Sequence, residues 1–249
     1  MNRRRALFAA VFALGLIAPL AHAQAAPTKY DLVIEGGRVI DPETGLDAVR
    51  NVGVEAGKVA VISADKLDGA RVIHAKGLIV APGFIDLHSH AQQLPGARMQ
   101  AFDGVTTALE LEAGILPVAR YYEDTAREGR PINYGAAASW AEARQAVMDG
   151  VAPEPSIEAF EKAAGLPNWS GKIATEDQIQ AISKLVDQGL AEGGLGVGFL
   201  IGYAPPSGRK EYYEINRLAA QRNVPTFTHV RFMSVEEPQS SFEAYQEMV

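Results

Sequence analysis

Cysteine is absent from this chain of 249 residues. Without a thiol there can be no disulfide, no cysteine nucleophile and no thiolate ligand for a metal ion. A chain that needs no disulfides is compatible with export, although the lack of cysteine does not identify a compartment. Thiolate chemistry is therefore excluded, and any side-chain nucleophile in this protein must be an oxygen or a nitrogen.

Positive charge is also scarce. The chain has 23 Lys and Arg against 30 Asp and Glu, which gives a formal net charge of −7. Removal of an N-terminal segment with Arg3, Arg4 and Arg5 would bring the charge near −10 (−7 minus 3). This balance argues against nucleic acid and anionic membranes as partners. An anionic substrate would need a local cation in its site, and the oligomeric state stays open.

The apolar run near the N-terminus is too short to cross a bilayer. Residues 6–18 form 13 apolar positions, whereas a membrane-spanning helix needs roughly 20. Basic residues precede this run, and Ala21-His22-Ala23 supplies the small residues of a cleavage site. We therefore expect a signal peptide over 1–23, cleavage before Gln24, and a periplasmic or secreted protein whose residues 24–29 form a linker.

The rest of the chain divides into two patterns. Over residues 30–81, apolar runs of four or five alternate with glycine-containing turns, which predicts a small β-sandwich-like subdomain. Beyond Pro82, strand-like runs alternate with helical segments, a pattern typical of a parallel sheet. The five strand-like runs are 83–87, 105–111, 132–138, 195–201 and 226–230.

Helix-capping patterns support this α/β interpretation. Thr175-x-x-Gln178 opens a helix predicted over 175–189, another is predicted over 211–221, and Ser240-x-x-Glu243 starts a third. Five β/α units fit into about 168 residues, whereas a complete eightfold TIM barrel takes about 250. The alternatives are an open five-stranded sheet and a (β/α) barrel that stops before closing. We favour the incomplete barrel, over 82–249.

The segment from Pro82 to His90 contains the strongest chemical signal. An apolar strand ends in His88 and His90, and side chains at i and i+2 of a strand point to the same side. Imidazole nitrogens at this spacing can reach one zinc ion, at about 2.0–2.1 Å. The carboxyl ends of barrel strands are also where that fold places its active site. The pair predicts half of a metal site.

This segment resembles the first-strand signature of the amidohydrolase superfamily, in which a small β domain precedes a metal-binding β/α barrel. Other stretches are similar to the D-aminoacylase, or N-acyl-D-amino-acid deacylase, branch and its N-acyl-D-glutamate deacylase members. These stretches are 104–107, 194–197, 202–205 and 228–231. The likeness covers nearly everything from Tyr30 onward. It implies a metal-dependent hydrolase with one or two divalent ions such as Zn²⁺.

Further ligands follow from the resemblance. His229 ends the fifth strand-like run, where the family places its third histidine ligand. The D-aminoacylase pattern has a cysteine ligand after its second strand, but this chain has Glu110 and Glu112 there. Carboxylates inside an apolar strand are costly to bury unless they are paired or bound to a cation, and carboxylate oxygens also bind zinc. We prefer Glu112, which lies nearer the strand end, over Glu110.

Two residues are candidate substrate contacts. Arg231, two positions beyond His229, could bind a substrate carboxylate, although a surface arginine is an equal alternative. Tyr203 matches the branch's Tyr-x-Pro segment and could line the pocket or simply pack on its proline. Arg209 and Lys210 look like solvated loop cations. We assign no role to the two remaining histidines, His22 and His74.

The resemblance also implies two residues that lie outside the chain. The family's sixth-strand histidine and the eighth-strand aspartate, its general base, would both fall after Val249. For the complete enzyme we expect hydrolysis of a linear amide, with N-acyl-D-amino acids such as N-acyl-D-glutamate as small-molecule substrates. The alternatives are a dipeptidase or cyclic-amide hydrolase, and a truncated, inactive chain.

Overall fold

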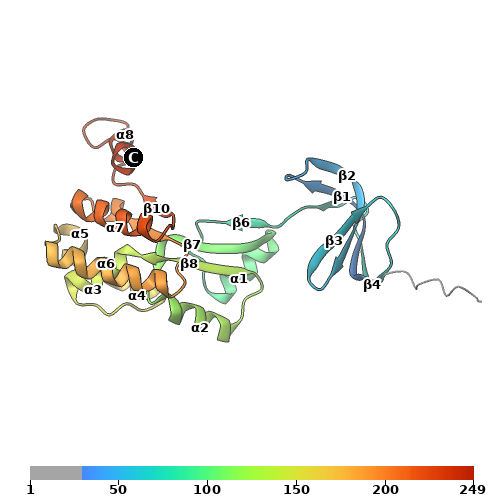
Figure 1. The fold of residues 1–249 in the computed structure, drawn as a ribbon, viewed down its shortest axis with the longest axis horizontal. Coiled ribbons are helices and arrows are strands. Elements are labelled where there is room, and N and C mark those ends of the chain that lie inside the picture. Colours follow the sequence, from blue (N-terminus) through green and yellow to red (C-terminus); the bar gives the residue numbers. More distant parts are fainter. Residues whose placement is uncertain (1–29) are drawn as a thin grey trace, which may run out of the picture. The chain divides into compact units, whose positions relative to one another are not determined.

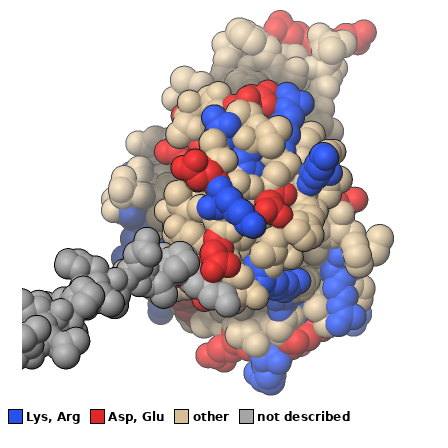
Figure 2. Space-filling view, turned by 90° about the vertical axis from the view of Figure 1, so that its right-hand side faces the viewer, with Lys and Arg blue, Asp and Glu red and all other residues tan. Residues whose placement is uncertain are grey.

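The computed structural model describes residues 30–249, which form parts of two compact units, 1–82 and 83–249 (Figure 1). The predicted signal peptide and linker lie outside the described residues. Within 30–249, no helix combines the length and the apolar character that a membrane crossing requires. On the face drawn in Figure 2, acidic and basic side chains are intermixed, so this face carries no field of a single sign.

The first unit is a five-stranded mixed sheet, which confirms the expected all-β composition of this region. Its strands are β1 (Tyr30–Asp41), β2 (Leu46–Glu55), β3 (Lys58–Ser63), β4 (Gly69–His74) and β5 (Ile79–Val80). The order is β3-β2-β1-β4, with β5 also paired to β1. Ala56 and Gly57 join β2 to β3 and both have positive φ, 49° and 74°, as a tight type I′ hairpin requires.

The second unit is built on five parallel strands, which confirms the predicted repeat of β/α units. They are β6 (Phe84–Asp86), β7 (Val105–Ile115), β8 (Asn133–Ser139), β9 (Val197–Leu200) and β10 (Thr226–His229). Their spatial order, β10-β9-β8-β7-β6, follows the chain. Sequential order with every pair parallel is the arrangement of a (β/α) barrel wall, so the partial-barrel alternative is the correct one.

Helices connect these strands. They are α1 (Leu94–Phe102), α2 (Val118–Glu128), α3 (Trp140–Asp149), α4 (Ile157–Ala164), α5 (Pro167–Gly171), α6 (Glu176–Ala191), η1 (Ile201–Tyr203), α7 (Arg209–Gln221) and α8 (Ser241–Met248). Both predicted capping boxes form, with Thr175 and Gln178 at α6 and with Ser240 and Glu243 at α8. Each satisfies backbone N–H groups that the first turn leaves free.

The main core lies where α3, α6 and α7 pack against β8 and β9. Ile182 and Val186 of α6, Phe199 of β9 and Ile215 of α7 are fully buried there, together with Trp140 of α3. The apolar residues of α6 recur every three or four positions, so one helix face can cover the sheet. This packing fixes the strand ends that carry the candidate site.

A buried ion pair joins α3 to α7. Arg144 and Glu211 bond to each other, with side chains 0% and 1% exposed. Arg144 also donates to the backbone carbonyls of Trp169 and Lys172, and the indole of Trp140 donates to Glu211 at 2.8 Å. Every charge in this network has partners, which a buried charge requires.

Candidate metal centre

The segment after β6 runs alongside β7 although it is not a regular strand. The amide of Ser89 donates to the carbonyl of Leu109 at 3.1 Å, and His88 forms an isolated bridge with Glu110. At the start of the segment, the amide of His88 donates to Oδ1 of Asp86 at 3.0 Å. The two histidines therefore lie beside the acidic end of the second barrel strand.

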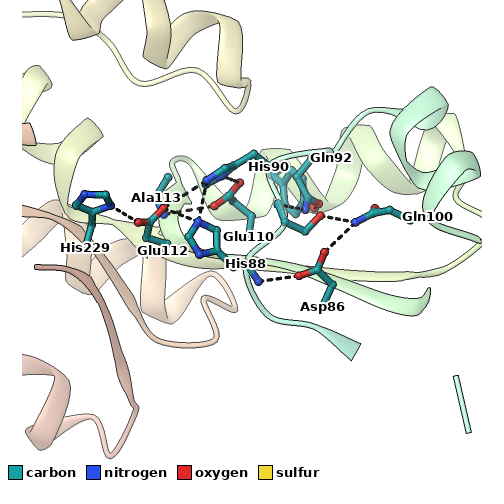
Figure 3. A network of polar contacts seen from close by, with 11 residues as sticks. Asp86, His88, His90, Gln92, Gln100, Glu110, Glu112, Ala113 and His229 are labelled. Carbon is teal, nitrogen blue, oxygen red and sulfur yellow. Dashed lines mark hydrogen bonds and ion pairs between the residues drawn. The ribbon is translucent and has the colours of Figure 1, made fainter. Parts of the chain in front are cut away.

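Three potential ligand atoms converge at this point (Figure 3). The Nε2 atoms of His88 and His90 are 3.1 Å apart, and Oε2 of Glu112 is 2.9 Å and 3.3 Å from them. The ligand atoms of these three residues all lie within 4.8 Å of one another. Two nitrogens of one tetrahedral zinc ion would be roughly 3.3 Å apart at ordinary bond lengths. The geometry therefore fits a shared cation.

The second oxygen of Glu112 extends the cluster to the fifth strand. Oε1 accepts a hydrogen bond from Nδ1 of His229, at the end of β10, at 2.5 Å. The close approach depends on Gly202, because a Cβ at that position would lie 2.4 Å from Cδ2 of the His229 ring. The carboxylate of Glu112, on β7, thus lies between His229 at the end of β10 and the His88–His90 pair that follows β6.

Glu110 takes a different place from Glu112. Its carboxylate is 2% exposed and lies 2.7 Å from Nδ1 of His90, on the side of the ring that faces away from the convergent atoms. Burial raises the pKa of Glu110, and the hydrogen bond to His90 offsets part of that rise. Glu110 therefore orients the imidazole of His90 so that its Nε2 is presented to Glu112.

Tyr203 lies beside this cluster. Its ring centroid is 4.7 Å from that of His229, and the side chain is largely exposed. A hollow next to the cluster is lined by Tyr203 together with His90, Glu112 and Trp169. Tyr203 therefore belongs to the wall of the hollow beside the cluster.

Arg231 does not face this hollow with a free guanidinium, contrary to the expected substrate contact. Its Nε and Nη2 donate to the two carboxylate oxygens of Glu247 in α8, at 2.8 Å and 2.6 Å. Its Nη1 donates to the carbonyls of Pro205 and Ser207. The Arg231 side chain is 4% exposed, and this ion pair ties the end of β10 to α8 and to the segment after Tyr203.

Arg209, Lys210 and His74, which were considered from the sequence, take other places in the described residues. Arg209 and Lys210 open α7 instead of forming a loop, and Lys210 pairs with Glu176 at the surface. His74 pairs with Glu35 in the first unit, with Nδ1 and Oε2 2.8 Å apart. His22 lies outside the described residues. These placements leave the cluster itself rich in carboxylates and imidazoles.

Sequence reasoning missed one buried acid near the site. Glu142 of α3 is 5% exposed, lines a pocket together with His90 and Glu110, and accepts a hydrogen bond from the amide of Leu116 at 2.6 Å. Burial raises its pKa well above the ordinary value. The sequence signal that could have drawn attention to Glu142 is the Ser139-x-x-Glu142 capping pattern. This pattern predicts a helix start with Glu142 at the surface, not a buried acid.

Parallel β/α units with imidazoles and a carboxylate gathered at the strand ends define the class of barrel hydrolases that hold metal ions at this rim. The family model of the amidohydrolase family matches residues 71–249. The chain therefore belongs to the amidohydrolase family.

Solved structures with the same fold include D-aminoacylase, with a TM-score of 0.68 and 24% identity over 88% of this chain and 48% of that one. Another is N-acyl-D-glutamate deacylase from Bordetella bronchiseptica, complexed with zinc and a phosphonate inhibitor. It has a TM-score of 0.70 and 24% identity over 89% of this chain and 48% of the other. At this identity the likeness concerns the fold.

Curated relatives carry other names. A dihydroorotase of Anaeromyxobacter dehalogenans strain 2CP-C is 33% identical over 136 residues, which cover 54% of this chain and 30% of that protein. An allantoinase of Escherichia coli strain SMS-3-5 is 35% identical over 98 residues, or 36% and 21% of the two chains. The chain therefore spans less than half the length of the proteins it matches.

Proposed function

We propose that this chain supplies the metal-binding half of an enzyme that hydrolyses linear amides, with N-acyl-D-amino acids as substrates. The observation that carries the proposal is the convergence of His88 Nε2, His90 Nε2 and Glu112 Oε2 at the strand ends. Such a donor set, with one carboxylate and no sulfur, suits zinc and other borderline divalent ions.

Glu112 takes the position of a bridging ligand in this proposal. One of its oxygens faces His88 and His90, and the other faces His229. A carboxylate divided in this way can hold two cations close together, one beside the histidine pair and one beside His229. A solved D-aminoacylase structure with the same fold is described as having a binuclear metal centre, which supports a second ion in this proposal. Zinc is the expected metal.

The residues of the chain perform the supporting tasks. A divalent cation at such a site polarises a carbonyl group and lowers the pKa of water toward 7. Glu110 holds His90 in the tautomer whose Nε2 is free to bind, because its carboxylate accepts the proton of Nδ1. Tyr203 forms one wall of the hollow and is placed to contact the acyl or amino-acid part of the substrate.

The substrate class rests on the sequence resemblance and on the fold shared with D-aminoacylase and N-acyl-D-glutamate deacylase. Arg231 is not the cation for a substrate carboxylate in this proposal, because its guanidinium is paired with the carboxylate of Glu247. The chain covers 48% of the length of each of these two structures. The proposed activity accordingly belongs to the whole protein.

A second candidate is hydrolysis of a cyclic amide. It is favoured by the relatives named dihydroorotase and allantoinase, which match at 33% and 35% identity over parts of this chain. The same cluster could serve either reaction, because both begin with attack of water on an amide carbonyl. Substrate turnover is therefore the measurement that separates the candidates.

The test is a substrate panel with the zinc-loaded protein. N-acetyl derivatives of D-glutamate, D-leucine and D-lysine, their L-enantiomers, a Gly-Leu dipeptide and hydantoin are incubated in parallel, and released amine or ring opening is measured. The proposal predicts turnover of D-acyl compounds and none of hydantoin. Turnover of hydantoin alone would establish the cyclic-amide alternative. Metal binding without any turnover would show that the chain alone lacks the activity.

A further inference from the structure

The segment that carries both histidines has little backbone support of its own. Between β6 and α1 it contains neither helix nor strand. Its backbone is linked to β7 by the bridge at His88 and by the hydrogen bond from the amide of Ser89 to the carbonyl of Leu109. Ligand positions in a metal site must be held to about 0.5 Å. Side chains therefore have to fix this segment.

One end of the segment is held from α1. The amide group of Gln100 donates to Oγ of Ser89 at 2.8 Å and to Oδ2 of Asp86 at 3.2 Å. Oδ1 of the same Asp86 accepts from the amide of His88. These bonds fix the side of the segment that contains His88.

The other end is held by Gln92, which makes three kinds of contact. Its side-chain Nε2 donates to the carbonyl of Ser89 at 2.6 Å, so the side chain closes a short loop around His90. Its Oε1 accepts from the hydroxyl of Tyr121 at 2.5 Å. Its backbone carbonyl accepts from Nε and Nη2 of Arg130, at 3.2 Å and 2.8 Å.

The partners of Gln92 are buried in the second unit. Tyr121 is 3% exposed and packs with Ile115 and Ala136, and the side chain of Arg130 is 6% exposed. Both lie in the chain between β7, which carries Glu110 and Glu112, and β8. The bonds of Gln92 therefore tie the loop around His90 to the strand that presents its two acidic partners.

We infer that Gln92 is a positioning residue that sets the direction of the His90 imidazole toward Glu112. The inference rests on the proposed function, because it assumes that these side chains bind metal. A glutamine amide is suited to this place because it can accept from Tyr121 and donate to Ser89 at the same time. Glutamate of the same size would keep the first bond and lose the second.

The experiment compares Co²⁺ binding by the full chain, four single variants and the Gln92→Met/Tyr121→Phe double variant, using the visible absorption of the bound ion and competition with a chromophoric chelator. Gln92→Met removes both side-chain bonds at nearly constant volume, Gln92→Glu removes the donor, and Tyr121→Phe removes only the hydroxyl. Gln188→Met is the matched control, since Gln188 is exposed on α6 and bonds only to Glu192. Thermal unfolding of each metal-free variant is measured in parallel.

The inference predicts that Gln92→Met weakens Co²⁺ binding 10- to 100-fold and changes the absorption spectrum. Tyr121→Phe should weaken binding less, and the double variant should be no worse than Gln92→Met, since both act through one hydrogen bond. The Co²⁺ affinity of Gln92→Glu should lie between those of Tyr121→Phe and Gln92→Met, and the affinity of Gln188→Met should match that of the wild type.

A Gln92→Met variant that unfolds at a lower temperature but keeps wild-type Co²⁺ affinity and spectrum would overturn the inference, because Gln92 would then support the fold alone. A wild-type chain that binds no Co²⁺ would instead overturn the proposed function together with this inference. The two failures are distinguished by the wild-type titration.

Discussion

Two groups of ionisable side chains in residues 83–249 differ in their exposure and in how their polar atoms are arranged. Arg144 and Glu211 are sealed from solvent, and each finds partners within the fold. At the candidate metal centre, His88 and His90 are 60% and 45% exposed, and their Nε2 atoms face each other at 3.1 Å beside Glu112. The first group is closed off from solvent, whereas the second brings three potential ligand atoms together at an exposed point. The first arrangement is typical of a structural network, and the second is what the proposed metal site requires.

The largest expected effect is on stability, at the sealed pair. Glu211→Ala leaves Arg144 buried without its counter-ion and should lower the free energy of unfolding by about 3–5 kcal/mol, with little effect on the metal centre. Urea denaturation followed by tryptophan fluorescence measures it, because both tryptophans, Trp140 and Trp169, lie in the second unit.

The control for this change is Asp187→Ala, which breaks the exposed pair with Arg222 between α6 and α7. An exposed pair contributes about 0–1 kcal/mol. Equal losses for the two variants would contradict the distinction between sealed and exposed pairs.

The next effect concerns metal affinity at the open group. Glu110→Gln keeps the shape of the side chain but replaces the carboxylate beside Nδ1 of His90. Zinc affinity should fall 10- to 100-fold, as is typical when a residue behind a ligand is changed. Competition with a chromophoric chelator measures the affinity, with the exposed Glu123→Gln of α2 as control. An unchanged affinity would mean that Glu110 does not orient His90.

Arg231 should belong with the sealed group. Arg231→Met leaves the buried carboxylate of Glu247 and the carbonyls of Pro205 and Ser207 without donors. The free energy of unfolding should fall by about 1–3 kcal/mol, and zinc affinity should not change. If stability stays at the wild-type value while KM for an N-acyl amino acid rises, Arg231 contacts substrate after all.

The smallest effect is a pH dependence at Glu142. Because burial raises its pKa above 4.5, the protonated carboxyl is favoured in the folded state, and its contribution to stability is lost as the pH rises through the folded pKa. Glu142→Gln has no charge to bury and can still accept from Leu116. Its unfolding free energy should match the wild type below pH 4.5 and exceed it increasingly at higher pH. Parallel pH profiles would refute this account.

Local patterns predicted the elements of the fold well. The Thr175 and Ser240 capping boxes place two helix starts correctly, because a cap depends on residues three apart. The five strands were found from their apolar runs, but β7 runs on to Ile115, and the register shift beyond Glu110 depends on its pairing with β8. Strand ends of this kind are set by neighbours that the local sequence does not contain.

The spacing of the four candidate residues was visible in the sequence, but not the backbone that carries the histidines. We expected His88 and His90 on a strand, whereas β6 ends at Asp86 and the two imidazoles converge from an irregular segment beside β7. The different contacts of Glu110 and Glu112 were not predictable from the sequence, because they depend on which carboxylate oxygen lies next to which imidazole ring in the folded structure. The bond between Arg231 and Glu247 was not predictable, because Glu247 is 16 residues away along the chain and becomes a neighbour only when α8 folds.

A zinc titration of the wild-type chain beside Glu112→Gln tests the central claim most directly, with Glu123→Gln as the matched control. Glu112 contacts His88, His90 and His229. Its loss should therefore weaken zinc binding by more than about 100-fold, the upper end of the effect expected when a residue that only orients a ligand is changed. The wild type and Glu123→Gln should bind at least one zinc ion per chain with equal affinity. A Glu112→Gln chain that binds zinc as tightly as the wild type, or a wild-type chain that retains none, would contradict the account.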